Sequence, residues 1–219
     1  KDINRNQLSK LIDAISTNLT SFFRENQHFD YLQKELLPHL LQKKQKNGNL
    51  RIRAWSAGCS SGEEPYSIAI TLLDNIPNPS AWDIKILASD ISESMIGIAD
   101  TGIYPKEKVA PVSQSQKYRF FISRRIKGKK TYEVSTALRD ITMFRYLNLV
   151  KEWPIKCPVD FIFCRNVMIY FDKSTQQELI NRFWDILDSG GIFFTGHSES
   201  LTGITHKFKY LYPTIYMKP

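Results

Sequence analysis

Residues 51–66, RIRAWSAGCSSGEEPY, decide how the chain folds. The first five are rich in strand formers, a run of small residues with Gly58 and Gly62 follows, and Pro65 precedes an apolar helical pattern. This order predicts a strand, a tight loop and a helix N-terminus. In an α/β sheet a nucleotide-like ligand binds at such a loop, because small residues let the backbone approach it and the first helical N–H groups lack partners.

The loop differs from the phosphate-binding motifs. It lacks the Gly-Lys-Ser/Thr ending of a P-loop, and Gly58 and Gly62 do not form G-x-G-x-x-G. Glu63 and Glu64 would repel a pyrophosphate but suit a ligand with a positive charge. A ligand with an adenosine part and an amino-acid part, such as S-adenosylmethionine, meets both conditions. The alternative is an ordinary strand-to-helix turn whose acids stabilise the first helical turn.

Composition and charge limit the function classes. The 219 residues are 42% hydrophobic and carry a formal net charge of +8, which favours acidic partners. The densest basic run is 124–130. No apolar stretch is long enough to span a membrane and no signal peptide is visible, so we expect a cytoplasmic protein that is not inserted in a membrane. Cys59, Cys157 and Cys164 lack metal-ligand spacing and are expected to be reduced thiols.

Two further strands predict the ligand edge of a parallel sheet. Residues 83–89 form a strand that ends at Asp90, where this architecture holds ribose hydroxyls; the alternative is that Asp90 caps a helix begun at Ser92. Residues 160–164 form an apolar, buried strand that ends in Arg165-Asn166. Polar residues at the carboxyl ends of such strands are expected beside the ligand.

Other segments supply helices and an insertion. Residues 28–46 predict a helix before the first strand, and residues 174–188 predict another with Ser174 as its N-cap. Residues 118–122 and 131–134 flank a basic turn and predict a small hairpin inserted between units of the sheet.

Four motifs occur in order along the chain. They are N-L-T-S-F-F-R-E at 18–25, W-S-A-G-C-S-S-G-E-E-P-Y-S at 55–67, F-C-R-N-V-M-I-Y-F-D at 163–172 and G-H-S-E at 196–199. Together they resemble the CheR family, S-adenosylmethionine-dependent methyltransferases that esterify glutamate side chains of bacterial chemoreceptors. The likeness runs from about Leu8 to the C-terminus.

The resemblance implies a fold and a domain division. The fold is an α/β, class I (Rossmann-like) methyltransferase sheet with helices on both faces and a small inserted antiparallel β-subdomain at about residues 103–140. Residues 1–48 would be a helical segment, the remnant of a helical recognition domain with its linker helix, and residues 49–219 the methyltransferase domain. The family usually carries a whole N-terminal helical domain whose basic helix helps to recognise the receptor. Either that domain was removed here, or this member uses a different substrate.

The resemblance also implies the cofactor contacts. Residue by residue they carry over to Asn18, Thr20, Arg24, Glu63, Asp90, Asn148, Leu149, Arg165 and Asn166. Glu63 would face the methionine amino group, with Glu64 as the fallback. Asp90 would bind the ribose hydroxyls, and Asn148-Leu149 would frame the adenine. The cofactor is S-adenosylmethionine, its product S-adenosylhomocysteine, and no metal is expected.

Arg24 and Tyr170 are the catalytic residues that the resemblance implies, near the transferred methyl group and the incoming carboxylate. A sulfonium methyl is already activated, and a glutamate carboxylate, with a reference pKa of about 4.3, is ionised at neutral pH. Transfer is therefore a direct in-line displacement without a general base. The protein has to position the reactants and exclude water.

The partners implied by the resemblance are methyl-accepting chemotaxis receptors, through an acidic helical cytoplasmic region and a C-terminal tail peptide that docks on the β-subdomain. We expect a monomer. A nucleic-acid methyltransferase is the second reading of the +8 charge, but residues 165–168 stand where such enzymes tend to carry Asn/Asp-Pro-Pro-aromatic, so no nucleic acid is expected. The alternatives are a methyltransferase of the same fold that acts on another acidic protein or on nucleic acid, and a non-catalytic cofactor-binding signalling module.

Overall fold

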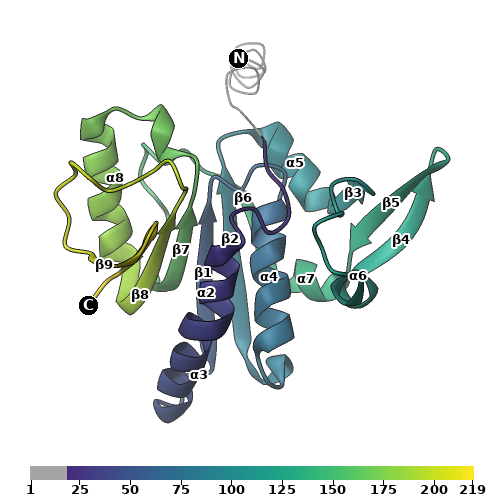
Figure 1. The fold of residues 1–219 in the computed structure, drawn as a ribbon, viewed down its shortest axis with the longest axis horizontal. Coiled ribbons are helices and arrows are strands. Elements are labelled where there is room, and N and C mark those ends of the chain that lie inside the picture. The colour runs from purple at the N-terminus through teal and green to yellow at the C-terminus, as the bar shows by residue number, and fades with distance from the viewer. Residues whose placement is uncertain (1–18) are drawn as a thin grey trace.

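The computed structural model of this chain describes residues 19–219, which are built around a seven-stranded sheet (Figure 1). The strand order is β6-β2-β1-β7-β8-β10-β9; the pairs from β6 to β8 are parallel, and β10 is antiparallel to both neighbours. In that order the strands span Thr142–Tyr146, Asp83–Asp90, Arg51–Ala57, Val159–Cys164, Leu187–Thr195, Ile215–Met217 and Lys209–Tyr212. Asn18 and the rest of the expected helical segment before Leu19 lie outside the described residues.

Helices lie on both faces of this sheet. On one face a continuous segment of α2 (Gln27–Tyr31), a π-helical turn (Leu32–Leu36) and α3 (Leu37–Lys46) runs beside α4 (Glu63–Asn75), as Figure 1 shows. On the other face α8 (Lys173–Ile186) packs in a separate core cluster. The shorter helices are α5 (Glu93–Thr101), α6 (Gln114–Phe120) and α7 (Thr136–Ile141), with 3₁₀ turns at Pro79–Ala81 and Met168–Tyr170.

Strand β7 shows why the sheet needs both layers. Phe161 and Phe163 pack with α2 to α4, whereas Ile162 and Cys164 point the other way and pack with α8. All six residues of β7 are buried, as the apolar run predicted for a parallel strand in the middle of a sheet. The predicted fold class is therefore confirmed by the topology and by the two helical layers.

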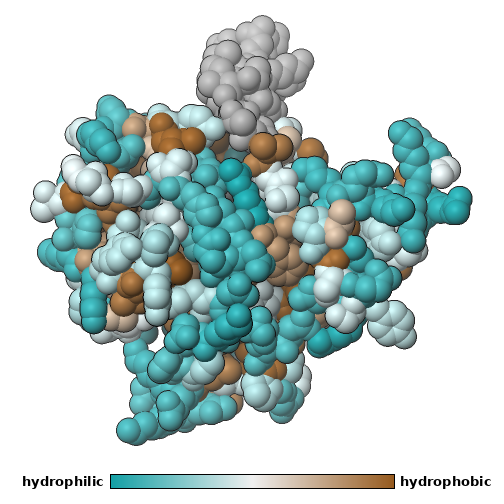
Figure 2. Space-filling view, in the orientation of Figure 1, coloured by the Kyte–Doolittle hydropathy of each residue, from teal (hydrophilic) through white to brown (hydrophobic). Residues whose placement is uncertain are grey.

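A second, three-stranded antiparallel sheet follows α5, in the order β3 (Ile103–Pro105), β5 (Lys129–Val134) and β4 (Phe121–Ile126). The β4–β5 hairpin projects from the body of the molecule (Figure 1) and is hydrophilic over most of its visible surface (Figure 2). The other end of this sheet is anchored, because the hydroxyl of Tyr104 donates to the carbonyl of Ser61 at 2.7 Å. The inserted sheet thus touches the glycine loop directly.

Two local predictions are wrong. Tyr118–Phe120 are helical rather than extended, because Ser113 forms a capping box with Gln116 and starts α6 there. Helix α8 begins at Lys173, and its N-cap is Asp172, whose carboxylate accepts from the N–H of Thr175 at 2.8 Å, rather than the predicted Ser174. No helix in the described part of the chain is both long and apolar enough to cross a membrane.

Candidate cofactor and active site

A cavity of about 340 Å³ opens where β1, β2, β6 and β7 end at their carboxyl edge. Polar and apolar side chains from segments far apart in the sequence line it. The sequence-predicted residues in its wall are Thr20, Arg24, Asp90, Asn148, Leu149, Arg165, Asn166 and Tyr170. Eight of the predicted positions are thus brought together at one site, while Asn18 lies outside the described residues.

The glycine loop after β1 forms one wall of the cavity. Gly58 has φ +90°, and a Cβ at this position would lie 2.3 Å from a methyl carbon of Val167, so only glycine fits. Ser60 also adopts a left-handed conformation, at φ +46°, which turns its N–H toward Asp90. The loop therefore brings backbone, rather than bulky side chains, up to the cavity.

Asp90, at the end of β2, is held by main-chain donors. Its two carboxylate oxygens accept from the N–H groups of Ser60 at 2.8 Å and Ser92 at 2.9 Å. The N-cap of α5 is Ser92, whose hydroxyl accepts from the N–H of Met95. Ser92, and not Asp90, therefore caps α5. Asp90 holds the glycine loop and lines the cavity.

The two adjacent acids at the start of α4 point in different directions. Glu63 is fully buried and turns away from the cavity wall, with the hydroxyl of Ser61 at 2.7 Å and the ammonium of Lys108 at 3.0 Å from its carboxylate. Glu64 lines the cavity and accepts from the hydroxyl of Ser56 at 2.7 Å. Glu64, the fallback acid, therefore lines the cavity, whereas Glu63, which the resemblance favoured, is not among the lining residues.

Arg165, at the end of β7, joins the walls of the cavity. Its side chain is almost fully buried, and Nε donates to Glu64 at 2.9 Å while Nη1 donates to the carbonyl of Arg24 at 2.7 Å. Burial raises the pKa of Glu64, and the Arg165 charge works against that shift. The guanidinium thus favours the charged form of a buried carboxylate beside the cavity and ties that carboxylate to the Arg24 segment.

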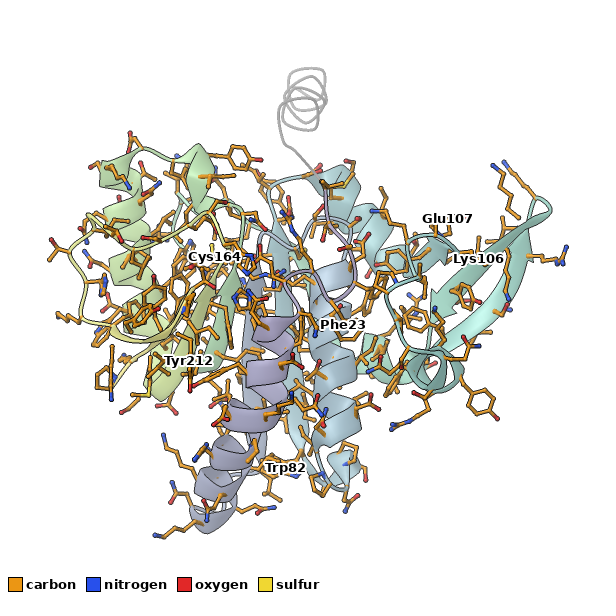
Figure 3. The ribbon with its side chains drawn as sticks, viewed as in Figure 1. Phe23, Trp82, Lys106, Glu107, Cys164 and Tyr212 are labelled. Carbon is orange, nitrogen blue, oxygen red and sulfur yellow. The ribbon has the colours of Figure 1, made fainter. Side chains whose placement is uncertain are left out.

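Arg24 lies in a strained loop before α2. Its neighbours Phe23 and Glu25 have φ of +55° and +56°, a conformation that costs energy for residues other than glycine. The loop is pinned to α4 by the N–H of Phe23, which donates to the hydroxyl of Ser67 at 2.9 Å, and Figure 3 shows Phe23 beside that helix. The guanidinium of Arg24 donates to the carbonyl of Leu19 at 2.7 Å. Strain that the packing maintains in this way turns Arg24 toward the cavity.

The loop after β7 forms the opposite wall. Asn166 adopts φ +59°, and its side-chain oxygen is buried at the cavity wall without a hydrogen-bond partner in the described structure. Tyr170 keeps 56% of its surface exposed at the mouth. The main chain of this loop is held by Glu199, which accepts from the N–H groups of Asn166 and Ile169. Glu199 belongs to the G-H-S-E motif, but no spacing in the sequence connects it with residues 166–169.

The proposed adenine residues lie after β6. Asn148 accepts from the N–H of Val150 at 3.0 Å and forms a turn, and Leu149 is buried beneath it. The carbonyl of Leu149 accepts from the indole of Trp153 at 2.9 Å and from Arg182 at 2.8 Å. This turn is therefore fixed from below while its upper face lines the cavity.

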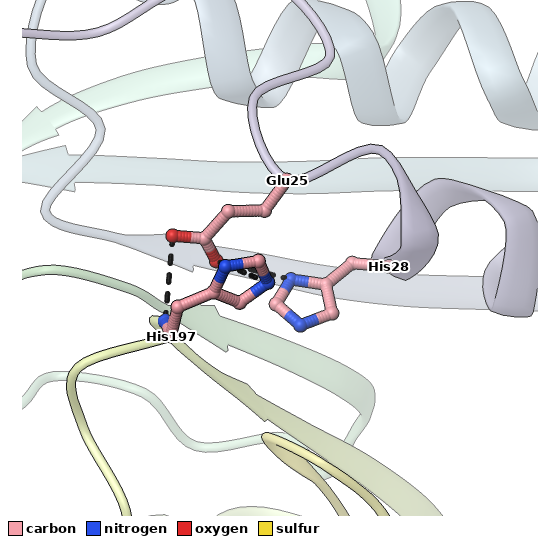
Figure 4. A group of neighbouring side chains, drawn as sticks. All are labelled: Glu25, His28 and His197. Carbon is pink, nitrogen blue, oxygen red and sulfur yellow. Dashed lines mark hydrogen bonds and ion pairs between the residues drawn. The ribbon is translucent and has the colours of Figure 1, made fainter.

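Glu25, His28 and His197 gather beside the cavity with ligand atoms close enough to hold a metal ion (Figure 4). The ring of His28 is already bonded at both nitrogens: Nδ1 accepts from Arg165 at 3.0 Å and Nε2 donates to the hydroxyl of Thr214 at 2.7 Å. A cation here would also face the Arg165 guanidinium, whose Nη1 is 3.9 Å from Glu25. The cluster is better explained as a brace between the Arg24 loop and the loop after β8.

The chain matches a described protein family and several curated relatives, including the three that follow. Residues 18–217 match the family described as "CheR methyltransferase, SAM binding domain". The chain is 42% identical over 214 residues to "Chemotaxis protein methyltransferase" of Borreliella burgdorferi, with 97% of this chain and 74% of the relative covered. It is 41% identical to "Probable chemotaxis protein methyltransferase" of Rhizobium etli (89% and 72% covered) and 39% identical to "Chemotaxis protein methyltransferase" of Escherichia coli (94% and 68% covered).

Proposed function

The chain belongs to the CheR methyltransferase family, and from this premise we propose that it transfers a methyl group from S-adenosylmethionine to glutamate side chains of chemoreceptors. The observation that carries the proposal is the convergence of Arg24, Glu64, Asp90 and Tyr170 on one cavity at the carboxyl edge of the sheet. Sheets of this kind bind nucleotide-like ligands at that edge. The product esters would serve adaptation in chemotaxis.

The donors and acceptors of the cavity fit the cofactor. A bound S-adenosylmethionine supplies a methyl group on a positively charged sulfur, together with an amino group and ribose hydroxyls. Glu64 is the acid that we assign to the amino group, in place of Glu63, because it lines the cavity and stays paired with Arg165. Asp90 binds the ribose hydroxyls, and Asn166 belongs to the polar wall beside the ligand. Thr20 and Asn148-Leu149 complete the proposed contacts.

Arg24 and Tyr170 are assigned to the substrate carboxylate. Arg24 is half-buried at the wall and Tyr170 lies at the mouth, so both can reach a glutamate that enters from solvent. A guanidinium and a phenol can each donate to one carboxylate oxygen and leave the other oxygen to attack the methyl carbon. The chain supplies position and a desolvated wall, and the reaction needs no base.

Calorimetry and a transfer assay test this function. S-adenosylhomocysteine should bind the protein, and tritiated S-adenosylmethionine should label receptor-enriched membranes with a base-labile methyl group. Arg24→Gln should lower the transfer rate by tenfold or more and change the affinity for S-adenosylhomocysteine less than threefold. Binding without label on the receptor would remove the receptor as substrate, and absence of binding would overturn the cofactor site.

We further propose that the β4–β5 hairpin docks on an acidic segment of the receptor, such as its C-terminal tail. The hairpin is exposed from Ile122 to Lys130 and carries Arg125, Lys127, Lys129 and Lys130. Replacing Lys127 and Lys129 by glutamine should raise the KM for the receptor and flatten its salt dependence, whereas replacing Lys34 and Lys46 on the α2–α3 segment should not. Equal effects of the two pairs would refute hairpin docking.

We also propose a monomer that works in the cytoplasm, where the receptor region with the methylated glutamates lies. Light scattering at the concentration of the transfer assay tests the monomer, because a stable dimer would double the measured mass. Fractionation of the host cells tests the compartment.

A further inference from the structure

We infer that Glu199 is a positioning residue for methyl transfer: its carboxylate holds the Asn166–Tyr170 loop, and with it Tyr170, at the wall of the cavity. The inference rests on the proposed function, since it concerns the same reaction. Glu199 does not line the cavity, so it can act only through the residues that it holds.

Three main-chain N–H groups converge on this one carboxylate. Oε2 accepts from Asn166 at 2.5 Å and from Gly196 at 2.7 Å, and Oε1 accepts from Ile169 at 3.2 Å. The N–H of Glu199 closes a turn on the carbonyl of Gly196 at 2.8 Å. The side chain is 5% exposed, so water cannot replace these bonds at low cost. The loop after β8 thereby holds the loop after β7.

The geometry requires an acceptor with two oxygens. Strand β7 ends at Cys164, and Asn166 adopts a left-handed conformation. The N–H groups of Asn166 and Ile169 therefore lie beyond the strand and cannot bond within the sheet. An ionised carboxylate offers only acceptors, whereas the amide of a glutamine would turn an NH₂ group against at least one N–H donor. Bonds to a carboxylate are also shorter and stronger than bonds to a neutral amide.

Gly196 shows how closely the two loops approach. A Cβ on Gly196 would lie 2.6 Å from the side-chain nitrogen of Asn166 and 2.7 Å from Oε2 of Glu199. No larger residue fits there without displacing the carboxylate from its donors. The glycine and the glutamate of the G-H-S-E motif therefore act together, one by leaving room and the other by binding.

We call the bonds from the N–H groups of Asn166, Gly196 and Ile169 to Glu199 the Glu199 clamp. The segment that this clamp holds carries groups that the reaction needs. Asn166, Ile169 and Tyr170 all line the cavity, and Tyr170 is the most exposed of the three. Tyr170 is 56% exposed and its N–H is bonded within the loop, to Val167, so little besides the main chain fixes its direction. Without these bonds Tyr170 is still present, but it no longer has a fixed position beside the substrate carboxylate.

The test is a double-mutant cycle of Glu199→Gln and Tyr170→Phe, with kcat measured on receptor-enriched membranes at saturating S-adenosylmethionine. Glu199→Gln should lower the unfolding midpoint by several degrees, because a buried N–H loses its acceptor. It should also lower kcat tenfold or more when kcat is measured well below that midpoint, where the variant is folded. Tyr170→Phe should lower kcat at least fivefold in the wild-type background and less than twofold in Glu199→Gln, because the hydroxyl is no longer held in place. Glu178→Gln, on the exposed side of α8, is the matched control and should leave kcat unchanged.

The other outcomes decide against the inference in distinct ways. Wild-type kcat in Glu199→Gln would show that the clamp does not position the reacting groups. Independent effects of the two substitutions, which multiply within twofold, would make Glu199 a stabilising residue only. A wild-type protein that binds S-adenosylhomocysteine but labels no receptor would instead remove the proposed function, and this inference with it.

Discussion

The two walls of the cavity are held in different ways. The wall of the glycine loop is built from neighbours in one strand–helix–strand unit: Ser60 bonds to Asp90, 30 residues later and on the adjacent strand. The opposite wall, which the loop after β7 forms, is held by charged side chains from distant segments. Arg165 bonds to Glu64 across 101 residues and to the main chain of Arg24 across 141. The contacts of the first wall form within one strand–helix–strand unit. The second wall depends on buried charged groups that come together only when distant segments pack.

This difference predicts where a single substitution does most damage. Arg165→Met removes the cation from between Glu64 and the Arg24 carbonyl and leaves a buried carboxylate without its charge partner. Breaking such a pair by deleting one partner costs about 3–5 kcal/mol. Chemical denaturation should show a loss of that size in the free energy of unfolding.

The matched control is Arg124→Met on the hairpin. Arg124 also pairs with a glutamate, Glu133, but its side chain is 53% exposed. Exposed pairs contribute about 0–1 kcal/mol, so the control should lose no more than that. Similar losses for the two variants would mean that the second wall does not depend on its buried charges.

The same difference explains what the sequence could predict. The strand, glycine loop and helix at residues 51–75 were predictable because turn residues and periodicity act locally. The placement of Asp90 at the cavity followed from its position at the end of the next strand. Arg165 and Asn166 were predicted in the same way, from the end of the buried strand 160–164. The family motifs added Arg24 and Tyr170, whose roles in the reaction are proposals.

The sequence could not predict which side chains meet across the chain. Glu63 and Glu64 are chemically identical neighbours, and only the position of Lys108 on one side and Arg165 on the other separates them. The clamp of Glu199 on Asn166 is a bond to main-chain N–H groups, which leave no mark in the sequence. Long-range contacts of this kind follow from the packing of the whole sheet.

Glu63 and Glu64 allow a second comparison, because only the carboxylate of Glu64 is bound to Arg165 at the cavity. Glu64→Gln should weaken binding of S-adenosylhomocysteine about tenfold or more, or about 1.4 kcal/mol, because the amino group loses a charged acceptor. Adenosine has no amino-acid part, so its affinity should change less than threefold. Calorimetric titration of both ligands measures the contrast.

Glu63→Gln is the matched variant, since it changes the same group one residue earlier on the same helix. Its carboxylate faces Lys108 and Ser61 rather than the cavity, so binding of both ligands should stay within threefold of wild type. The opposite order, with Glu63→Gln selectively weakening S-adenosylhomocysteine, would return the amino-group role to the first acid.

The smallest effect concerns the brace behind the second wall, where His28 is held neutral. Burial, together with the charges of Arg165 and His197, lowers the pKa of His28 from 6.5 to about 3. Below pH 6.5 this histidine is protonated in the unfolded chain, whereas in the folded chain it stays neutral until about pH 3. The stability conferred by the neutral ring is therefore present above pH 6.5 and is lost as the pH falls toward 3. At pH 5.5 the loss should be about 1.4 kcal/mol, or about 4 °C in the unfolding midpoint.

His28→Gln removes this dependence while it keeps the bonds, since the amide can accept from Arg165 and donate to Thr214 as the imidazole does. Between pH 8 and pH 5.5 the midpoint of His28→Gln should therefore fall by about 4 °C less than that of the wild type. His39→Gln, at an exposed histidine, is the control and should follow the wild type. If His28→Gln also follows the wild type, the protonated ring is tolerated beside Glu25, which lies 3.6 Å from its Nδ1, and the second wall has a counter-charge of its own. If the predicted difference appears, that wall depends on a neutral ring under the Arg165 guanidinium, and acid should loosen it before it affects the glycine loop.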